Sequence, residues 1–575
     1  MKKRITIALF SILTLFSFAQ NTTIPHLQAN GSTTQLIVKG KPFLILGGEF
    51  HNSSTSSNTY MQPLWEQMKK KNLNTLFAPV YWELIEPQEN KFDFTLVDQM
   101  IEGARKQDLH LVILWFASWK NGYSMYVPAW VKTNTDRFHR VKNKSGESFV
   151  VLSAQSDNAM KADAKAFKAL MQHIRQVDEK EQTVIMVQIE NEAGLFYEPR
   201  DYNEEANKAW QQGVPADLIK YLTTNKDKLQ PELDSAWKAN GRKTSGSWEN
   251  VFGKSVFSKD WRQLSYLPEE LFSVYHYSKY IGHVAAAGKE AYPIPMFVNA
   301  WIKQQGFHWP GKYPSGGPIP HTLDLWRMNA PSVDFIAPDI YVDIPEAQYT
   351  ISHYHRAGNP VFIPEFKPGA LAASLAFWAY GQHDVKAFSP FGIEDTTPEN
   401  DPITKSYAAL AQVQELILQH QGKGTMAGIY LDTTSTTQTF KLNGFDIKAT
   451  LSLPTTLPEG GAVAGLTSSN AKVISAGGIL FATAPDEFIL LGKDFTLALN
   501  PLTVDSKKPK IDIEYLDEVS LINGKWETGR RLNGDESTGG GDYGFGYHNG
   551  RFGAVKFQLA RDGRYSILKI KFYRY

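Results

Sequence analysis

Glutamates at the ends of two apolar runs are the residues of this sequence best suited to acid–base chemistry. Residues 183–194 read TVIMVQIENEAG, so an apolar run stops at Glu190-Asn191-Glu192. Another run, PVFIPEF, carries Glu365 near its end. Charge is costly to bury, so carboxylates at the end of a buried strand indicate function. Paired carboxyl groups can cleave a glycosidic bond, because one protonates the leaving oxygen and the other meets the anomeric carbon.

Eight apolar runs, separated by stretches of helical period, must position these glutamates. They lie between about Lys41 and Ile393 and read FLILGGEF, NTLFAPVYW, HLVILWF, TVIMVQIE, PMFVNAW, DFIAPDIY, PVFIPEF and KAFSPFG. Buried strands that alternate with helices predict a parallel sheet, and eight such strands close a (β/α)₈ barrel. Catalytic side chains of these barrels lie at the C-terminal ends of the strands, where the fourth run carries Glu190-Asn191-Glu192 and the seventh Glu365. The sequence pattern does not decide whether Glu190 or Glu192 faces the barrel centre.

The sequence divides into an export signal, a barrel and a second domain. Residues 1–19 contain three basic residues, then a short apolar run, and then small residues at the spacing of a signal-peptide cleavage site. This order predicts a signal peptide. The predicted barrel spans 20–420, with a polar insertion around 195–290. Strand-like runs without helices follow over 421–575 and predict a β-sandwich. The expected fold is therefore α/β, a (β/α)₈ TIM barrel followed by a C-terminal all-β sandwich.

Composition excludes several classes of function. The 575 residues include no cysteine, which rules out disulfides, thiolate metal sites and a lipid-anchored cysteine. A net charge of +1 offers no field for nucleic acid or an anionic membrane. The 14 Trp, 25 Tyr and 33 Phe can supply flat apolar surfaces for sugar rings. Metal-ligand spacings are absent, so we predict neither a metal nor another cofactor in an exported, periplasmic or secreted protein.

Several motifs resemble those of one glycosidase family. VQIENEAG and PVFIPEF are similar to the acid/base and nucleophile motifs of the retaining (β/α)₈-barrel glycosidases, and more narrowly of glycoside hydrolase family 35, the β-galactosidases. YWELIEPQENKFDF resembles that family's W-N-x-H-E-P-x-x-G-x-F-D-F signature. Residues 47–51 and the Pro-Ala-Trp at 128–130 match further family segments, so the resemblance runs from about Phe43 to Phe366. The C-terminal domain resembles the sandwich of a divergent bacterial branch.

This resemblance implies a role for each motif residue. Glu192 becomes the acid/base, Glu365 the nucleophile, and Asn191 a hydrogen-bond partner of the sugar 2-hydroxyl. The implied protein is an exported, retaining exo-β-glycosidase, a β-galactosidase that removes terminal galactose from oligosaccharides or plant polysaccharide side chains. Retention would place the two carboxyl groups roughly 5 to 5.5 Å apart.

The third run departs from the family pattern, and other strand ends offer further sugar-binding candidates. Asn121 stands where typical members have a glutamate that contacts galactose. Trp115 and Trp301 suit stacking on sugars, with barrel packing as the equal alternative. Tyr341 is favoured because it ends the sixth run, next to the strand of the nucleophile. Further candidates, for which a salt bridge is the stronger alternative, are Glu49 and Asp339.

Two alternative functions stay open. Because the third run departs from the family pattern, the sugar can be a β-xyloside, a β-mannoside or an arabinoside. The second alternative is a carbohydrate-binding protein on a barrel without catalysis. Against it stands the combination of both glutamates with Asn191, which a binding protein does not need together. The fold alone does not decide between them.

Overall fold

The computed structural model describes residues 23–575 except 256–259, 261, 263–267, 357, 453–474, 504–505, 509, 523, 533–554 and 560–563. The predicted signal peptide, residues 1–19, lies outside the described residues. In the described part of the chain, no helix is long and apolar enough to cross a membrane.

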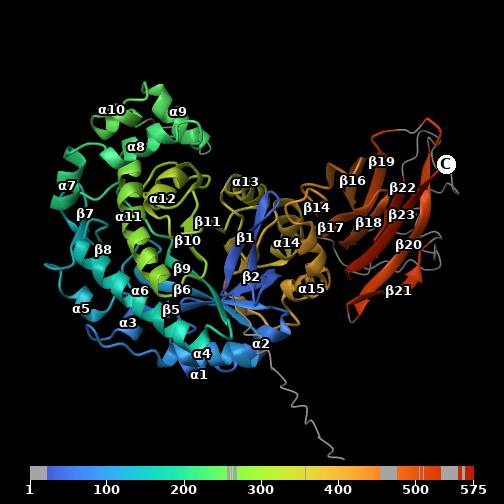
Figure 1. Cartoon of the computed structure of the whole chain (residues 1–575), viewed down its shortest axis with the longest axis horizontal. Coiled ribbons are helices and arrows are strands. Elements are labelled where there is room, and N and C mark those ends of the chain that lie inside the picture. The colour runs from blue at the N-terminus through green and yellow to red at the C-terminus, as the bar shows by residue number, and fades with distance from the viewer. Residues whose placement is uncertain are drawn as a thin grey trace, which may run out of the picture.

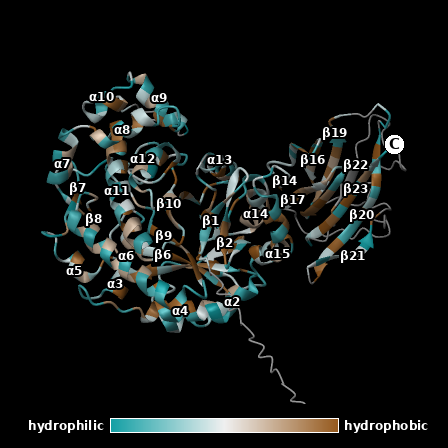
Figure 2. Cartoon of the chain, viewed as in Figure 1, coloured by the Kyte–Doolittle hydropathy of each residue, from teal (hydrophilic) through white to brown (hydrophobic). Residues whose placement is uncertain are grey.

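Eight parallel strands close into a barrel, which confirms the predicted (β/α)₈ fold (Figure 1). They are β4 (Ile45–Glu49), β5 (Thr75–Tyr81), β6 (His110–Lys120), β9 (Val184–Asn191), β10 (Met296–Trp301), β11 (Phe335–Ile340), β12 (Ile363–Phe366) and β13 (Ala387–Pro390). The barrel closes through β9 beside β10 and β13 beside β4. Helices cover the outer face, so nearly every strand residue is buried, as their apolar runs require. Figure 2 shows the hydrophobic residues on the barrel strands and hydrophilic residues on the outer helices.

The helices around and between these strands vary widely in length. They are α1 (Asn58–Met61), α2 (Leu64–Lys70), α3 (Trp82–Ile85), α4 (Thr95–Lys106), α5 (Ala129–Lys132), α6 (Asp157–Asp178), α7 (Glu204–Gln211), α8 (Ala216–Thr224), α9 (Pro231–Ala239), α10 (Trp248–Phe252), α11 (Pro268–Ala291), α12 (Leu323–Asn329), α13 (Ile344–Tyr354), α14 (Ala370–His383) and α15 (Pro402–His420). Helix α6 begins where the Ser156 side chain accepts a hydrogen bond from the Ala159 amide, and it buries Phe167 and Leu170 at helical spacing. Short 3₁₀ turns cover Pro320–Thr322 and Ile393–Asp395.

The predicted insertion at 195–290 has two parts. Its first part forms α7 to α10, which extend beyond the barrel (Figure 1). Its second part contributes α11, which packs along α6 as a helix of the barrel wall. The insertion proper therefore ends before α11. The sequence pattern did not separate the two because α11 is buried around most of its surface and shows little amphipathic contrast.

Two small antiparallel sheets were not predicted. One consists of β1 (His26–Asn30), β2 (Thr33–Val38) and β3 (Lys41–Phe43). Leu36 and Val38 of this sheet join a core cluster with Ile45, Phe77 and other inward residues of the barrel strands. The sheet therefore closes the end of the barrel at which the strands begin. The other sheet pairs β7 (Arg140–Lys142) with β8 (Ser148–Leu152).

Two antiparallel sheets after the barrel confirm the predicted C-terminal β-sandwich (Figure 1). The larger has the order β14-β17-β18-β23-β20-β21 and the smaller β15-β16-β19-β22. Their bounds are β14 (Met426–Asp432), β15 (Thr437–Leu442), β16 (Phe445–Leu451), β17 (Ser475–Ala484), β18 (Glu487–Gly492), β19 (Phe495–Pro501), β20 (Ile511–Ile522), β21 (Lys525–Arg531), β22 (Val555–Gln558) and β23 (Ser566–Arg574). Ile447 of one sheet and Leu480 of the other share a core. The larger sheet also packs on α14, where a Cβ at Gly428 would lie 2.4 Å from the Trp378 carbonyl oxygen.

Candidate active site

The side chains of the triplet Glu190-Asn191-Glu192, at the end of β9, lie in different surroundings. Glu190 and Glu192 both have left-handed backbone conformations, with φ of 57° and 47°, which are uncommon for residues other than glycine. Strand alternation therefore stops at this point. The Glu190 carboxylate lies in the layer between strands and helices, where it accepts a hydrogen bond of 2.7 Å from the Trp119 amide. Asn191 and Glu192 lie with Glu365 at the barrel mouth.

Glu365, on β12, is held by three donors. The Nδ2 atoms of Asn191 and Asn299 donate to its Oε1, at 3.1 and 3.3 Å. The Tyr341 hydroxyl donates to its Oε2 at 2.8 Å. Both oxygens of this buried carboxyl group thus have partners, which fixes its orientation in the mouth.

Glu192 is a buried acid beside Glu365. Burial first, and then the charge of Glu365, raises the pKa of Glu192 to about 8, while Lys120 acts in the opposite direction. Its backbone amide donates to Oδ1 of Asn299 at 2.8 Å, which fixes the end of β9 against β10. A group with this pKa holds its proton at neutral pH and can release it during a reaction.

Two more carboxyl groups lie in the same cluster. Asp339, at the end of β11, accepts a hydrogen bond of 2.7 Å from Asn299, and burial followed by the Glu365 charge raises its pKa well above the usual value. Glu49, at the end of β4, is fully buried, and burial and Glu365 raise its pKa in the same way. Among the described residues, neither oxygen of Glu49 has a hydrogen-bond partner, so the salt-bridge alternative has no support there. Such oxygens cost about 1–3 kcal/mol each unless a ligand satisfies them.

Glu192, Asp339 and Glu365 each present an oxygen, and the three oxygens lie within 4.8 Å of one another. This spacing would allow the three side chains to share a cation. Without a cation, the raised pKa values of Glu192 and Asp339 favour protons on these two groups. The absence of a metal cofactor stays a prediction.

Lys120 and Asn121 form the β6 side of the mouth. Lys120 is only 6% exposed, and its Nζ donates to Oδ1 of Asn121 at 2.5 Å. The Asn121 amide donates to the Asn191 carbonyl at 3.1 Å, so the backbone of Asn121 borders the triplet. Its side-chain oxygen is already engaged by Lys120.

The two predicted tryptophans lie in different places. Trp115 is fully buried against α6, where its Nε1 donates to Asp163 at 2.9 Å and its ring packs on Phe167. The structure therefore separates Trp115 from the mouth and favours the packing alternative. Trp301 ends β10 and is partly exposed, with its ring edge-on to Phe196 at 5.2 Å. The predicted aromatic residue that bonds Glu365 is Tyr341, through its hydroxyl.

Two side chains of the mouth were not predicted from the sequence. Asn299 and Lys120 both lie at or near the ends of barrel strands. Each is a polar residue within an otherwise apolar run, which is the signal that would have found them. Asn299 connects three carboxyl residues of the site, since its side chain bonds the Glu192 amide and the carboxyl groups of Asp339 and Glu365.

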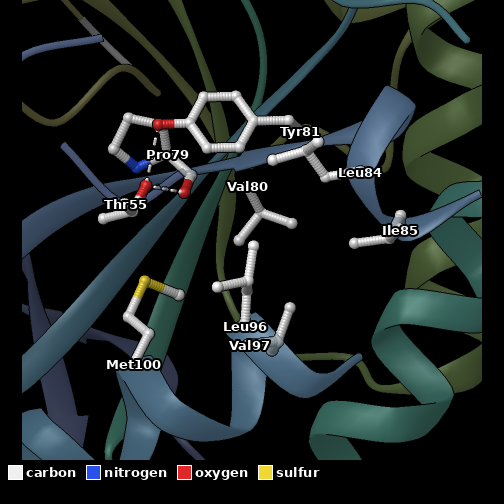
Figure 3. A pocket seen from close by; sticks show the side chains of 9 residues that line it. All are labelled: Thr55, Pro79, Val80, Tyr81, Leu84, Ile85, Leu96, Val97 and Met100. Carbon is white, nitrogen blue, oxygen red and sulfur yellow. Dashed lines mark hydrogen bonds between the residues drawn. The ribbon is translucent and has the colours of Figure 1, made fainter. Parts of the chain in front are cut away.

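A small apolar cavity lies elsewhere, on the outer side of β5 (Figure 3). It has a volume of about 10 Å³ and is lined by residues of β5, α3 and α4, among them Val80, Ile85 and Met100. This volume is about that of one water molecule. None of the clustered carboxyl groups lines it, so the candidate site is the barrel mouth.

Asn299→Ala should lower kcat about 10- to 100-fold, because Glu365 loses a donor and the Glu192 amide loses its acceptor. Asn359→Ala is the matched control, since Asn359 is equally buried but bonds the Ile336 and Tyr354 backbones, at the other end of β11. We expect both variants to lower Tm and only Asn299→Ala to lower kcat. Equal kcat values in the two variants would contradict a role for Asn299 in the site.

Comparison with known proteins finds two families that match separate parts of the chain. Residues 35–259 match the family described as "Glycosyl hydrolases family 35", and residues 403–542 match "Domain of unknown function (DUF5597)". A protein of Xanthomonas manihotis described as "Beta-galactosidase" is 28% identical over 179 residues, 29% of this chain and 27% of that protein. The chain thus matches about a quarter of the length of this relative.

Solved structures resemble the chain more distantly. A β-galactosidase from Bacillus circulans sp. alkalophilus has a TM-score of 0.44 and 16% identity, over 65% of this chain and 57% of that one. A β-mannanase from the blue mussel Mytilus edulis has a TM-score of 0.39 and 12% identity, over 67% of this chain and 96% of that one.

Proposed function

We propose that this chain, whose residues 35–259 match glycosyl hydrolases family 35, is a retaining exo-β-glycosidase. Its substrate in this proposal is a terminal β-galactoside of an oligosaccharide or of a plant polysaccharide side chain. The observation that carries the proposal is the pair Glu192 and Glu365, whose oxygens approach within 4.8 Å. Retaining glycosidases hold their carboxyl groups about 5–5.5 Å apart, and inverting ones about 6.5–9.5 Å.

The proposed reaction is a double displacement. A Glu365 oxygen forms a bond to the anomeric carbon while the glycosidic carbon–oxygen bond breaks, and the leaving oxygen takes the proton of Glu192. In the second step Glu192 removes a proton from water. The water oxygen bonds the anomeric carbon, and the ester to Glu365 breaks, which restores both carboxyl groups.

The pair of carboxyl groups also explains how Glu192 can change from acid to base. In the free site, the charge of Glu365 contributes to the raised pKa of Glu192. An esterified Glu365 carries no charge, so this contribution disappears in the covalent intermediate and the pKa of Glu192 falls. Glu192 is thereby protonated when an acid is needed and more readily ionised when a base is needed.

Unpartnered buried atoms support the binding of a sugar between these groups. Oδ1 of Asn191 and both oxygens of Glu49 lack partners among the residues that the structure describes. Sugar hydroxyls can donate to all three oxygens. This supports the roles proposed for Asn191 at the 2-hydroxyl and for Glu49 at another hydroxyl.

One feature favours an alternative sugar specificity. The Asn121 oxygen accepts from Lys120, and its amide is uncharged where typical family members have a glutamate. The proposed sugar pocket therefore differs from that of typical members on the β6 side. A β-xyloside, β-mannoside or α-arabinoside is the second candidate, with the same two catalytic residues.

Export is part of the proposal. The first 19 residues combine basic and apolar segments with small residues at cleavage spacing, which supports action in the periplasm or after secretion. A polysaccharide side chain is a substrate that such a protein can meet outside the cytoplasm.

Initial rates on nitrophenyl glycosides test the proposal. The panel comprises the β-galactoside, β-glucoside, β-xyloside, β-mannoside and α-arabinoside, with Glu365→Ala as control. We expect dominant turnover of the β-galactoside that the substitution abolishes. Another dominant sugar would overturn the galactose assignment and retain the chemistry. Binding of galactose without turnover of any glycoside would favour a carbohydrate-binding protein.

A further inference from the structure

A group of aromatic side chains lies at the rim of the mouth, which we call the aromatic wall: Tyr123, Phe196, Tyr197 and Trp301. Tyr197 is 74% exposed and Tyr123 is 37% exposed, and their hydroxyl oxygens lie 3.2 Å apart. Phe196 lies between them and the barrel, with its ring 6.2 Å from that of Tyr197 and 5.2 Å from that of Trp301. Rings from the ends of three strands therefore form one continuous surface.

The most exposed ring of the wall is presented on a strained backbone. Tyr197 has a φ of 71°, which bulky residues rarely adopt. Its amide donates to the Gly311 carbonyl at 2.8 Å, and Leu195 exchanges two backbone hydrogen bonds of 2.9 Å with Ser315. A rigid, strained segment that displays a large exposed aromatic ring indicates a binding role, because folding alone would favour burial of that ring.

The position of the aromatic wall relative to Glu192 indicates which part of the substrate binds there. Glu192 and Tyr197 belong to the same short segment after β9. On the β6 side, Tyr123 exchanges backbone hydrogen bonds of 2.8 and 3.0 Å with Lys120, a residue of the site. The acid/base protonates the leaving oxygen, so the leaving group must lie on the side of Glu192. Tyr341 and Glu365 lie together at the nucleophile.

We propose that the aromatic wall binds the sugars of the leaving group, so that the natural substrate is a glycosyl terminus on a longer, neutral oligosaccharide. The apolar faces of sugar rings stack on aromatic rings. The raised pKa values of Glu49, Glu192 and Asp339 favour protons on these groups, so Glu365 faces Lys120 and the mouth has no excess positive charge to attract acidic sugars. This inference rests on the proposed function and adds the substrate class of the leaving-group side.

Tyr197→Ala tests the inference in the full-length protein. We measure kcat/KM for the preferred nitrophenyl glycoside and for an oligosaccharide of four or more neutral sugars with the same terminal residue. The ratio of the oligosaccharide value to the nitrophenyl value should fall about tenfold, as expected when an exposed binding tyrosine is truncated. Tyr197→Phe retains the ring and should keep the ratio within about twofold of the wild-type value.

Tyr573→Ala is the matched control, because Tyr573 is 44% exposed and stacks on another tyrosine, Tyr575, far from the mouth on β23. Its ratio should equal that of the wild type. An unchanged ratio in Tyr197→Ala would overturn the inference and leave the proposed glycosidase intact. A wild-type protein that turns over neither substrate would overturn the proposed function, and the inference with it.

Discussion

Glu365→Ala should lower kcat on the order of 10⁴-fold or more for the preferred nitrophenyl glycoside. The substitution removes the oxygen that bonds the anomeric carbon, and no other carboxylate receives the same three donors, Asn191, Asn299 and Tyr341, among the described residues. Glu83→Ala is a suitable control, since Glu83 pairs with Lys132 at the surface and should leave kcat unchanged. Initial rates at saturating substrate measure both variants.

Rescue by azide distinguishes a Glu365→Ala protein that lacks only its nucleophile from one that is misfolded. In Glu365→Ala, azide can occupy the vacated space and bond the anomeric carbon as nitrophenolate leaves. One displacement inverts the configuration, so a β-glycoside should yield the α-glycosyl azide. Turnover restored with this product supports Glu365 as the nucleophile. Wild-type-like turnover without azide, or a β-product with azide, would contradict that role.

Glu192→Ala should lower kcat/KM about 10²- to 10⁴-fold for substrates with poor leaving groups. The loss should be much smaller for a dinitrophenyl glycoside, whose leaving group needs no proton. Azide should yield the β-glycosyl azide in this variant, because the intact Glu365 has already inverted the configuration once. A uniform loss for all leaving groups would contradict the acid/base role.

The pH profile of kcat/KM gives a second test of Glu192. In the free protein its pKa is raised to about 8, mainly by burial and then by the charge of Glu365. The acid must be protonated for the first step, so activity should be retained at neutral pH and fall as pH rises through about 8. Glu192→Ala has no such proton to lose, so this basic limb should be absent. The same limb in both proteins would assign the titration to another group.

The sequence by itself determined the architecture and the position of the two glutamates along it. Apolar runs bounded by turn residues are local signals, and all eight became barrel strands. The end of a parallel strand is also a local property, so the sequence alone was enough to predict Glu365 and the triplet Glu190-Asn191-Glu192 at strand ends around the barrel mouth. The same holds for Tyr341, which ends a run next to the strand of Glu365 and contacts it in the folded protein.

Only the tertiary structure decided which side chains face the mouth. The left-handed φ at Glu190 sends its carboxylate to Trp119 and leaves Asn191 and Glu192 at the mouth, which alternation along an ideal strand does not predict. Trp115 points outward because α6 supplies Asp163 and Phe167 as partners. The partners of Asn299 come from other strands, so only the folded structure shows that it bonds Glu192 and Glu365. A local pattern reports burial, whereas the partner of a buried polar group comes from a distant part of the chain.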